Sequence, residues 1–147
     1  MKIFLGADHN GFAMKNTLAA VLGKAGYEVS DTGDVQLRPD DDFPQFAEAA
    51  VHALLASDAD ARAILICGSG QGMCMAANRF KGIRASLCWD VDEARASRND
   101  DDSNVLCLPA RFMDTDEAVR IAETWLATPF AGAARFKRRI RQLDQLG

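Results

Sequence analysis

The stretch Ala63–Gly72, AILICGSGQG, decides the fold of this chain. Its first part, Ala63–Ile66, is a short, wholly apolar run, which is typical of a strand buried on both faces of a parallel sheet. Three glycines then fall within the five residues Gly68–Gly72, and a helix is predicted through Met73–Asn78. A buried strand that passes through a glycine-rich loop into a helix is a building unit of α/β proteins.

The chain on both sides of this unit repeats the alternation of strand and helix. Further strands are predicted at Lys2–Leu5, Tyr27–Val29, Ile83–Trp89 and Val105–Leu108. Further helices are predicted at Phe12–Ala25, Phe43–Ala56, Asp92–Arg98, Asp114–Ala127 and Ala133–Leu146. We therefore expect one domain over residues 1–147, a three-layer Rossmann-like α/β fold. Its five-stranded parallel sheet carries helices on both faces, right-handed crossovers and a C-terminal helix. Ligands of such sheets bind outside the carboxyl ends of the strands.

Composition narrows the class of protein further. The 147 residues are 48% hydrophobic and 26% charged, which suits one domain with a sizeable core and excludes a disordered or collagen-like chain. No apolar run reaches the roughly 18 residues of a membrane span, and the apolar stretch Ile3–Leu5 is too short for a signal peptide. The sequence thus predicts a cytoplasmic protein. A net charge of −4 and a pI near 5.1 argue against a nucleic-acid partner.

The four cysteines form no CxxC pair, and the chain has only two histidines, so neither a zinc site nor a disulfide framework is expected. Cys67 differs from the other three because it precedes the glycine loop. Backbone amides of such a loop at a helix N-terminus attract negative charge, which favours a thiolate and makes Cys67 a candidate base or nucleophile. Cys74, Cys88 and Cys107 are expected to be inert buried thiols.

The glycine loop does not fit three known motifs. A phosphatase-type loop would need Arg at position 73, and the dinucleotide fingerprint G-x-G-x-x-G would need Gly there, but the residue is Met73. The Gly-Lys-Ser/Thr ending of a P-loop is also absent.

Two other places in the chain carry candidate site residues. Asp8 and His9 follow the first strand, where they are either ligands at the mouth of the sheet or a capping carboxylate and an exposed loop residue. Arg135 and Arg139 share one face of the last helix, where paired guanidinium groups suit a phosphate. The alternative for this helix is a charged amphipathic surface packed by the apolar stripe of Phe136, Ile140 and Leu143. His52 is interpreted as structural.

Five segments together resemble the type B ribose-5-phosphate isomerases, a family that includes the subunits of galactose-6-phosphate isomerase. These segments are Gly6–Phe12, Ile64–Gly72, Ala76–Arg79, Gly82–Ala85 and Ser103–Leu106. The resemblance implies an aldose–ketose isomerase of phosphorylated sugars that needs no metal or organic cofactor. It also implies a homodimer or a dimer of dimers, with active sites shared between subunits.

The resemblance also implies roles for individual residues. Cys67 would move a proton between C1 and C2 through an enediolate, and Ser69 with the loop amides of Gly68, Gly70, Gln71 and Gly72 would stabilise the oxyanion. Asp8 would hold sugar hydroxyls. The phosphate would be bound by His9, Arg111, Arg135 and Arg139, one or more of them from the partner subunit. Donors preorganised around a developing oxyanion are the physical requirement of this chemistry.

The sequence departs from the family where Asp100 replaces a histidine that helps to open the sugar ring and Asp101 replaces an asparagine that contacts the reacting oxygens. The tail also carries one extra residue before Arg135. A carboxylate at position 100 can still act as a base, but it adds negative charge near an anionic intermediate. A four-carbon sugar 4-phosphate needs no ring opening and is one alternative substrate. A hexose 6-phosphate, or a subunit that binds sugar phosphate without catalysis, are the others.

Overall fold

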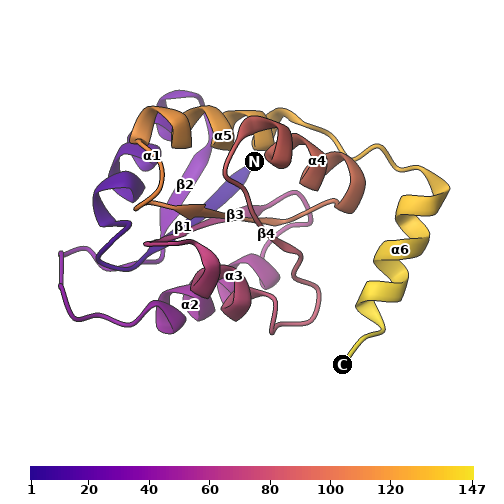
Figure 1. Ribbon diagram of the computed structural model, residues 1–147, viewed down its shortest axis with the longest axis horizontal. Helices are drawn as coiled ribbons and strands as arrows, with labels where there is room; N and C mark the ends of the chain where they lie inside the picture. Colours follow the sequence, from indigo (N-terminus) through magenta and orange to yellow (C-terminus); the bar gives the residue numbers. More distant parts are fainter.

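The computed structural model describes all residues 1–147, and its strands and helices alternate as predicted (Figure 1). The strands are β1 (Lys2–Ala7), β2 (Glu28–Asp31), β3 (Arg62–Cys67), β4 (Ala85–Leu87) and β5 (Val105–Pro109). The helices are α1 (Phe12–Lys24), α2 (Phe43–Leu55), α3 (Gln71–Ala77), α4 (Val91–Asp101), α5 (Thr115–Ala127) and α6 (Ala134–Asp144).

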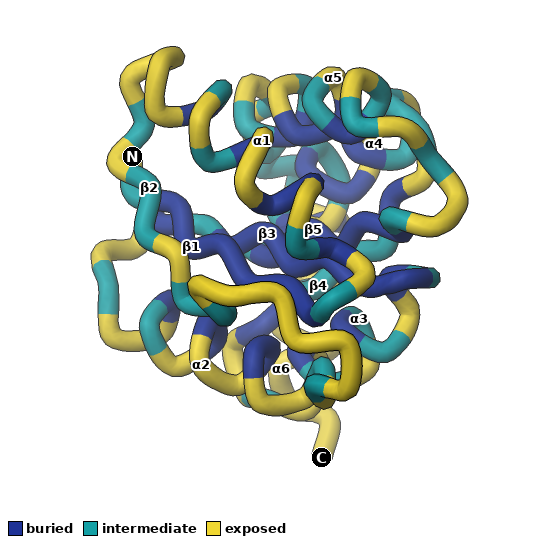
Figure 2. The backbone as a smooth tube through the Cα atoms, turned by 90° about the vertical axis from the view of Figure 1, so that its left-hand side faces the viewer, coloured by how far each residue is buried: buried dark blue, intermediate teal, exposed yellow.

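The five strands form one sheet in the order β2-β1-β3-β5-β4, and all pairings are parallel. The strand β3 lies at its centre, and its side chains alternate between two cores. Ile64 and Ile66 join the core covered by α1, α4 and α5, which is built around the fully buried Trp125. Leu65 and Cys67 join the core covered by α2 and α3. Figure 1 shows these two helical layers on opposite faces of the sheet, and Figure 2 shows the strands as the buried middle layer. The predicted three-layer α/β fold is confirmed.

The helix α6 stands apart from the three layers (Figure 1), and among the helices and strands it contacts mainly α4. Of its apolar stripe, Phe136 is buried at 8% exposure, whereas Leu143 is 49% exposed. An amphipathic helix stabilises itself by burying its apolar face. In the single chain, that burial is incomplete for α6.

The predicted element boundaries differ most from the observed ones in β4 and at the end of α4. The predicted strand Ile83–Trp89 shortens to Ala85–Leu87, because Gly82 takes a positive φ of 85° and Ile83 closes a turn onto Phe80. The helix, expected to end at Arg98, continues to Asp101. Carboxylates at a helix C-terminus oppose the helix dipole. Here Arg98 offsets this effect, since its guanidinium pairs with Asp102 at 2.7 Å.

No helix in the structure combines the length and the apolar character that crossing a membrane requires.

Candidate active site

Parallel pairing brings the ends of β1 and β3 together at the carboxyl edge of the sheet. Ala7 lies opposite Ile66, and the amide of Asp8 donates to the carbonyl of Ile66 at 3.3 Å. The turn after β1 can approach β3 this closely because residue 11 is a glycine: a Cβ at Gly11 would lie 2.5 Å from Cγ2 of Ile66. Asp8, His9 and Cys67 therefore share one edge of the sheet, as the sequence predicted.

The glycine loop depends on two glycines that have no space for a side chain. Gly70, the N-cap of α3, has a φ of 73°, and a Cβ there would lie 2.5 Å from the Leu87 side chain. A Cβ at Gly72 would lie 2.7 Å from the ring of Phe43. The loop is thus clamped between the end of the sheet and the start of α2. Ser69 is half-buried, and Gln71 is exposed at the first position of α3.

Cys67 is the last residue of β3 and has an exposed fraction of 5%. Its side chain belongs to the apolar core under α2 and α3, at the end of that core nearest the glycine loop. The carbonyls of Cys67 and Gly68 accept hydrogen bonds from the amides of Ala110 and Arg111, both at 2.9 Å. Cys67 therefore joins two regions: its side chain lies in the apolar core, and its backbone lies at the carboxyl edge that carries the glycine loop.

The other three thiols differ from one another. Burial raises the pKa of Cys88 and raises that of Cys107 well above the ordinary value, as expected for inert thiols. Cys74 corrects the expectation: a hydrogen bond from the Cys107 thiol, with further ones from the Leu87 backbone and Asn78, lowers the pKa of Cys74 to about 7 against an opposing burial effect. The Cys74 thiol is only partly buried on α3, and it donates to the carbonyl of Ala85 at 3.4 Å.

Asp8 combines the two interpretations that the sequence left open. Its carboxylate accepts hydrogen bonds from the amides of Asn10 at 3.0 Å and Gly11 at 3.3 Å, so it does cap the turn. It is also buried at the mouth, and this burial raises the pKa of Asp8 despite the two amide donors. Its second oxygen makes no hydrogen bond within the chain, which leaves it available to a ligand hydroxyl.

The partner of His9 is Asp41, a residue that the sequence analysis did not single out. One oxygen of Asp41 lies 2.8 Å from Nδ1 of His9 and accepts the His9 backbone N–H at 2.9 Å. This hydrogen bond, with the charges of Asp8 and Asp41, raises the pKa of His9, while burial and Arg111 lower it. The only available signal was the acidic run Asp40–Asp42, which does not reveal which carboxylate turns inward.

Asp8, His9 and Asp41 also offer three ligand atoms within 4.8 Å of one another. A cation would have to compete with the pairing between His9 and Asp41 and with the amides that bind Asp8. The present contacts explain the cluster without a metal.

Arg111 follows β5 and completes this edge. Its guanidinium lies next to the α-carbon of Gly68, and Nδ2 of Asn10 lies on the same side of that residue. An exposed guanidinium beside a glycine-rich loop can bind a phosphate group. The carboxyl edge thus holds Asp8, His9, Cys67, the glycine loop and Arg111.

The remaining predicted residues lie at the opposite edge. Asp101 ends α4, and its carbonyl accepts a hydrogen bond at 2.9 Å from Arg84, which directly precedes β4. The carbonyl of Asn99 accepts a hydrogen bond from Ala131, which brings the start of the tail to the same place. Burial and Asp100 raise the pKa of Asp101, and the charge of Arg139 on α6 lowers it. Since six residues of strand span roughly 20 Å, one chain does not bring Asp100, Asp101, Arg135 and Arg139 to Cys67.

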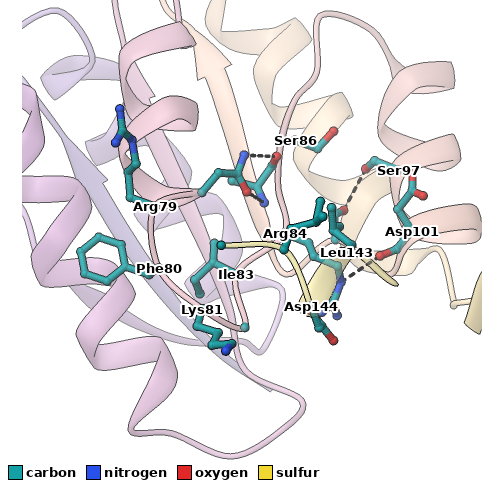
Figure 3. A pocket seen from close by; sticks show the side chains of 16 residues that line it. Arg79, Phe80, Lys81, Ile83, Arg84, Ser86, Ser97, Asp101, Leu143 and Asp144 are labelled. Atoms are coloured by element: carbon teal, nitrogen blue, oxygen red, sulfur yellow. Dashed lines mark hydrogen bonds between the residues drawn. The ribbon is translucent and has the colours of Figure 1, made fainter. Parts of the chain in front are cut away.

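A cavity lies beside this second group. It has a volume of about 640 Å³ and separates α6 from the segment 78–86 (Figure 3). Arg84 and Asp101 line it from the body, and Leu143 and Asp144 line it from α6 (Figure 3). None of the residues at the carboxyl edge contributes to it.

The fold and the carboxyl edge define an α/β enzyme that binds a small ligand at the strand ends. The family model described as Ribose/Galactose Isomerase matches residues 3–143. The chain is 38% identical over 136 residues to a probable ribose-5-phosphate isomerase B of Mycoplasma pneumoniae, covering 92% of this chain and 89% of that protein. It is 36% identical over 145 residues to ribose-5-phosphate isomerase B of Escherichia coli, covering 99% and 95% of the two chains.

Solved structures agree with the sequence relatives. A ribose 5-phosphate isomerase of Thermotoga maritima superposes with a TM-score of 0.93 at 41% identity, covering 99% of this chain and 98% of that one. Ribose-5-phosphate isomerase B of Mycoplasma genitalium with bound ribulose-5-phosphate superposes with a TM-score of 0.94 at 35% identity, covering 98% and 94%. The chain therefore belongs to the ribose/galactose isomerase family and is an aldose–ketose isomerase.

Proposed function

We propose that this isomerase interconverts ribose 5-phosphate and ribulose 5-phosphate, or a closely related pair of sugar phosphates. The proposal rests above all on one observation: Cys67 directly precedes the clamped glycine loop, at the same edge of the sheet as Asp8, His9 and Arg111. The relatives named for ribose 5-phosphate support the pentose. The relative with bound ribulose-5-phosphate supports it as well.

In the proposed reaction, the thiolate of Cys67 removes the proton from C2 of the open-chain aldose. The C1 carbonyl oxygen takes up the negative charge to form an enediolate, and the hydroxyl proton of O2 moves to O1. The Cys67 thiol then returns its proton to C1, which forms the C2 carbonyl of the ketose and regenerates the thiolate. Ser69 and the loop amides stabilise the charged oxygen, which is the largest contribution expected in a reaction of this kind. Asp8 holds sugar hydroxyls, and His9 and Arg111 bind the phosphate. A proton transfer between neighbouring carbons requires neither a metal nor an organic cofactor.

We further propose that a homodimer, or a dimer of dimers, completes each site. A second copy would bring the group at its amino edge, Asp100, Asp101, Arg135 and Arg139, to the carboxyl edge of the first. Two features support this arrangement: the incompletely buried α6 beside its cavity, and exposed large apolar side chains on α3 and near the strand ends. These side chains are Met75, Trp89 and Phe112. The four unpaired cysteines suit a cytoplasmic enzyme.

Asp100 favours a second candidate substrate, a tetrose 4-phosphate. Its carboxylate accepts a hydrogen bond from the Asn99 amide at 2.7 Å, at the position where the family has a ring-opening histidine. A tetrose 4-phosphate has its terminal hydroxyl blocked and forms no stable five-membered ring, so it reacts without ring opening.

Solvent deuterium exchange tests the proposed chemistry. Aldose and ketose phosphates of three to six carbons are incubated in D₂O with the wild type, Cys67→Ala and the control Cys74→Ala. We expect exchange at C1 or C2 with the wild type and the control, and none with Cys67→Ala. Exchange that persists in Cys67→Ala would disprove the role of this thiol. The absence of exchange with every sugar would indicate a subunit that only binds.

A mixing experiment tests the shared site. Cys67→Ala and the double variant Arg135→Ala/Arg139→Ala are each expected to be inactive. When they are mixed and allowed to exchange subunits, half of the dimers are hybrids, and each hybrid has one intact site if sites are shared. We expect recovery of about a quarter of the wild-type activity. No recovery despite proven exchange would mean that each site is built within one chain.

A further inference from the structure

Asp41 links two loops that are far apart in the sequence. Its side chain is 5% exposed, and a single carboxylate oxygen bonds both the backbone amide and the ring Nδ1 of His9, 32 residues away. The loop that carries Asp41 is itself anchored. The fully buried ammonium group of Lys15 donates to Asp31 and to the carbonyl of Asp34, at 3.0 Å and 2.7 Å. Asp41 therefore reaches His9 from a loop that is anchored at its start.

This contact determines which ring atom His9 can offer to a ligand. With Nδ1–H donating to Asp41, the free position is Nε2, and the side chain is 32% exposed. In the neutral ring of that tautomer, Nε2 carries a lone pair and repels an anion. Only the imidazolium presents Nε2–H as a donor. A phosphate ligand at His9 thus requires the charged ring, and a carboxylate on Nδ1 is the group that favours it.

We propose that Asp41 is a positioning residue of this enzyme, which holds His9 as an imidazolium with Nε2–H directed toward the substrate phosphate. The inference rests on the proposed sugar-phosphate isomerase function and deepens it, because it assigns the charge state of one phosphate ligand to a residue outside the recognised segments.

The charges around the ring agree with this assignment. Asp8 and Asp41 favour the imidazolium, and Arg111 opposes it; the net result is a raised pKa for His9, with the hydrogen bond from Asp41 as the largest cause. The ring therefore stays protonated to a higher pH than an isolated histidine. Removing the charge of Asp41 should lower the pKa of His9 and deprotonate the ring under mildly alkaline conditions, while leaving it protonated in acid.

Asp41→Asn tests the proposal, since asparagine keeps the shape and the oxygen acceptor but loses the charge. Asp40→Asn is the matched control, because Asp40 is an exposed neighbour in the same loop and its replacement changes the net charge equally. For ribose 5-phosphate, we expect Asp41→Asn to raise KM about tenfold at pH 8, with kcat within about threefold of the wild type. The KM ratio of variant to wild type should approach one near pH 5.5. Asp40→Asn should match the wild type throughout.

The substrate phosphate titrates equally in both experiments, so its effect cancels in the ratio of the variant KM to the wild-type KM at each pH. A merely structural role for Asp41 would impair the variant equally at every pH, and that result would overturn the proposal. So would a change in kcat alone.

NMR titration of the histidine rings provides a readout that does not require turnover. The chain has two histidines, and the His52 signals, from a ring in edge contact with Phe80, serve as the internal reference. We expect His9 to titrate at a lower pH in Asp41→Asn, and inorganic phosphate at pH 8 to shift the His9 signals in the wild type but far less in the variant. Equal titration in both proteins would refute the inference.

The same NMR experiment separates this inference from the proposed function. If no sugar phosphate is isomerised but the His9 titration and its response to phosphate depend on Asp41, the positioning role stands and the proposed function fails. If turnover occurs but the titration of His9 is the same in the wild type and in Asp41→Asn, the function stands and the inference fails.

Discussion

The guanidinium of Arg111 lies directly against the α-carbon of Gly68. A Cβ on residue 68 would be 2.9 Å from Nη2 and 3.1 Å from Cζ of Arg111, distances that require the guanidinium to move. The backbone of Gly68 does not adopt a positive φ, unlike that of Gly70. The missing side chain at residue 68 therefore serves the placement of a cation rather than the path of the chain.

We predict that Gly68→Ala folds normally but binds its substrate less well. The displaced Arg111 loses a charge-assisted hydrogen bond to the phosphate, so kcat/KM should fall about tenfold or more. Steady-state kinetics measure this loss, and thermal unfolding verifies the fold. In an Arg111→Ala background, Gly68→Ala should have little further effect, because the two changes act through the same group. Additive losses in this double-mutant cycle would show that residue 68 acts on something else.

Gly70→Ala should instead destabilise the protein. An alanine there must adopt a left-handed conformation and place its Cβ 2.5 Å from the Leu87 side chain and 3.0 Å from the Leu108 backbone. Strain and crowding together should cost about 2–4 kcal/mol of the free energy of unfolding. Gly23→Ala is the control, because Gly23 lies in α1 with no atom near its Cβ position, and it should stabilise by about 0.5–1 kcal/mol. Urea titrations measure the free energy of unfolding of both variants. Equal stability of Gly70→Ala and Gly23→Ala would contradict this account.

The fold could be predicted because its signals are local. The apolar run of β3 and the glycines after it are adjacent in the sequence, and parallel pairing then fixes which loops share an edge. The contact between His9 and Asp41 could not be predicted in this way. It depends on how a long polar loop folds back, and nothing local distinguishes Asp41 from Asp40 and Asp42.

The order of the predicted elements already determines the edge at which Asp100 and Asp101 lie, because residues that precede a strand of a parallel sheet lie at its amino edge. The boundary of α4 was predicted at Arg98 from the polar residues that follow, whereas the contacts of Arg84 and Arg98 with Asp102 extend the helix to Asp101. Asp100 and Asp101 fall at the amino edge, away from Cys67, because they precede the start of β5. Of the two ion pairs at this end of α4, Arg98–Asp102 has the helical spacing i, i+4, whereas Arg84–Asp102 joins residues 18 apart and leaves no local trace in the sequence.

Cys74 should be the most readily alkylated thiol after Cys67 is removed. Because its pKa is lowered to about 7, its thiolate fraction should rise about tenfold between pH 6 and pH 8, against about a hundredfold for an ordinary thiol. Iodoacetamide labelling of Cys67→Ala, followed by mass spectrometry, should show this shallow pH profile. Adding Cys107→Ala removes the largest cause of the lowered pKa of Cys74, so the labelling of Cys74 should then rise more steeply with pH. A steep profile before that change would contradict the assigned hydrogen bond.

Asp100→His is predicted to change the substrate preference of the enzyme. Ribose 5-phosphate exists mainly as a ring and must be opened before Cys67 can act, whereas a tetrose 4-phosphate reacts directly. An imidazole is a more effective proton-transfer group near neutral pH than a carboxylate, and well-placed acid–base groups contribute about 10²–10⁴-fold. We therefore expect kcat/KM for ribose 5-phosphate to rise about tenfold or more in Asp100→His, with the value for a tetrose 4-phosphate nearly unchanged.

The control for this experiment is Asp100→Asn, which removes the same negative charge at the same position but adds no imidazole. If it produced the same gain, relief of charge repulsion on the enediolate would be the cause, and ring opening would not be limiting. A wild-type enzyme that already converts ribose 5-phosphate much faster than any tetrose phosphate would contradict the tetrose candidate. Asp100 would then be a competent ring-opening base, because no other residue of the chain stands at the position of the family's histidine.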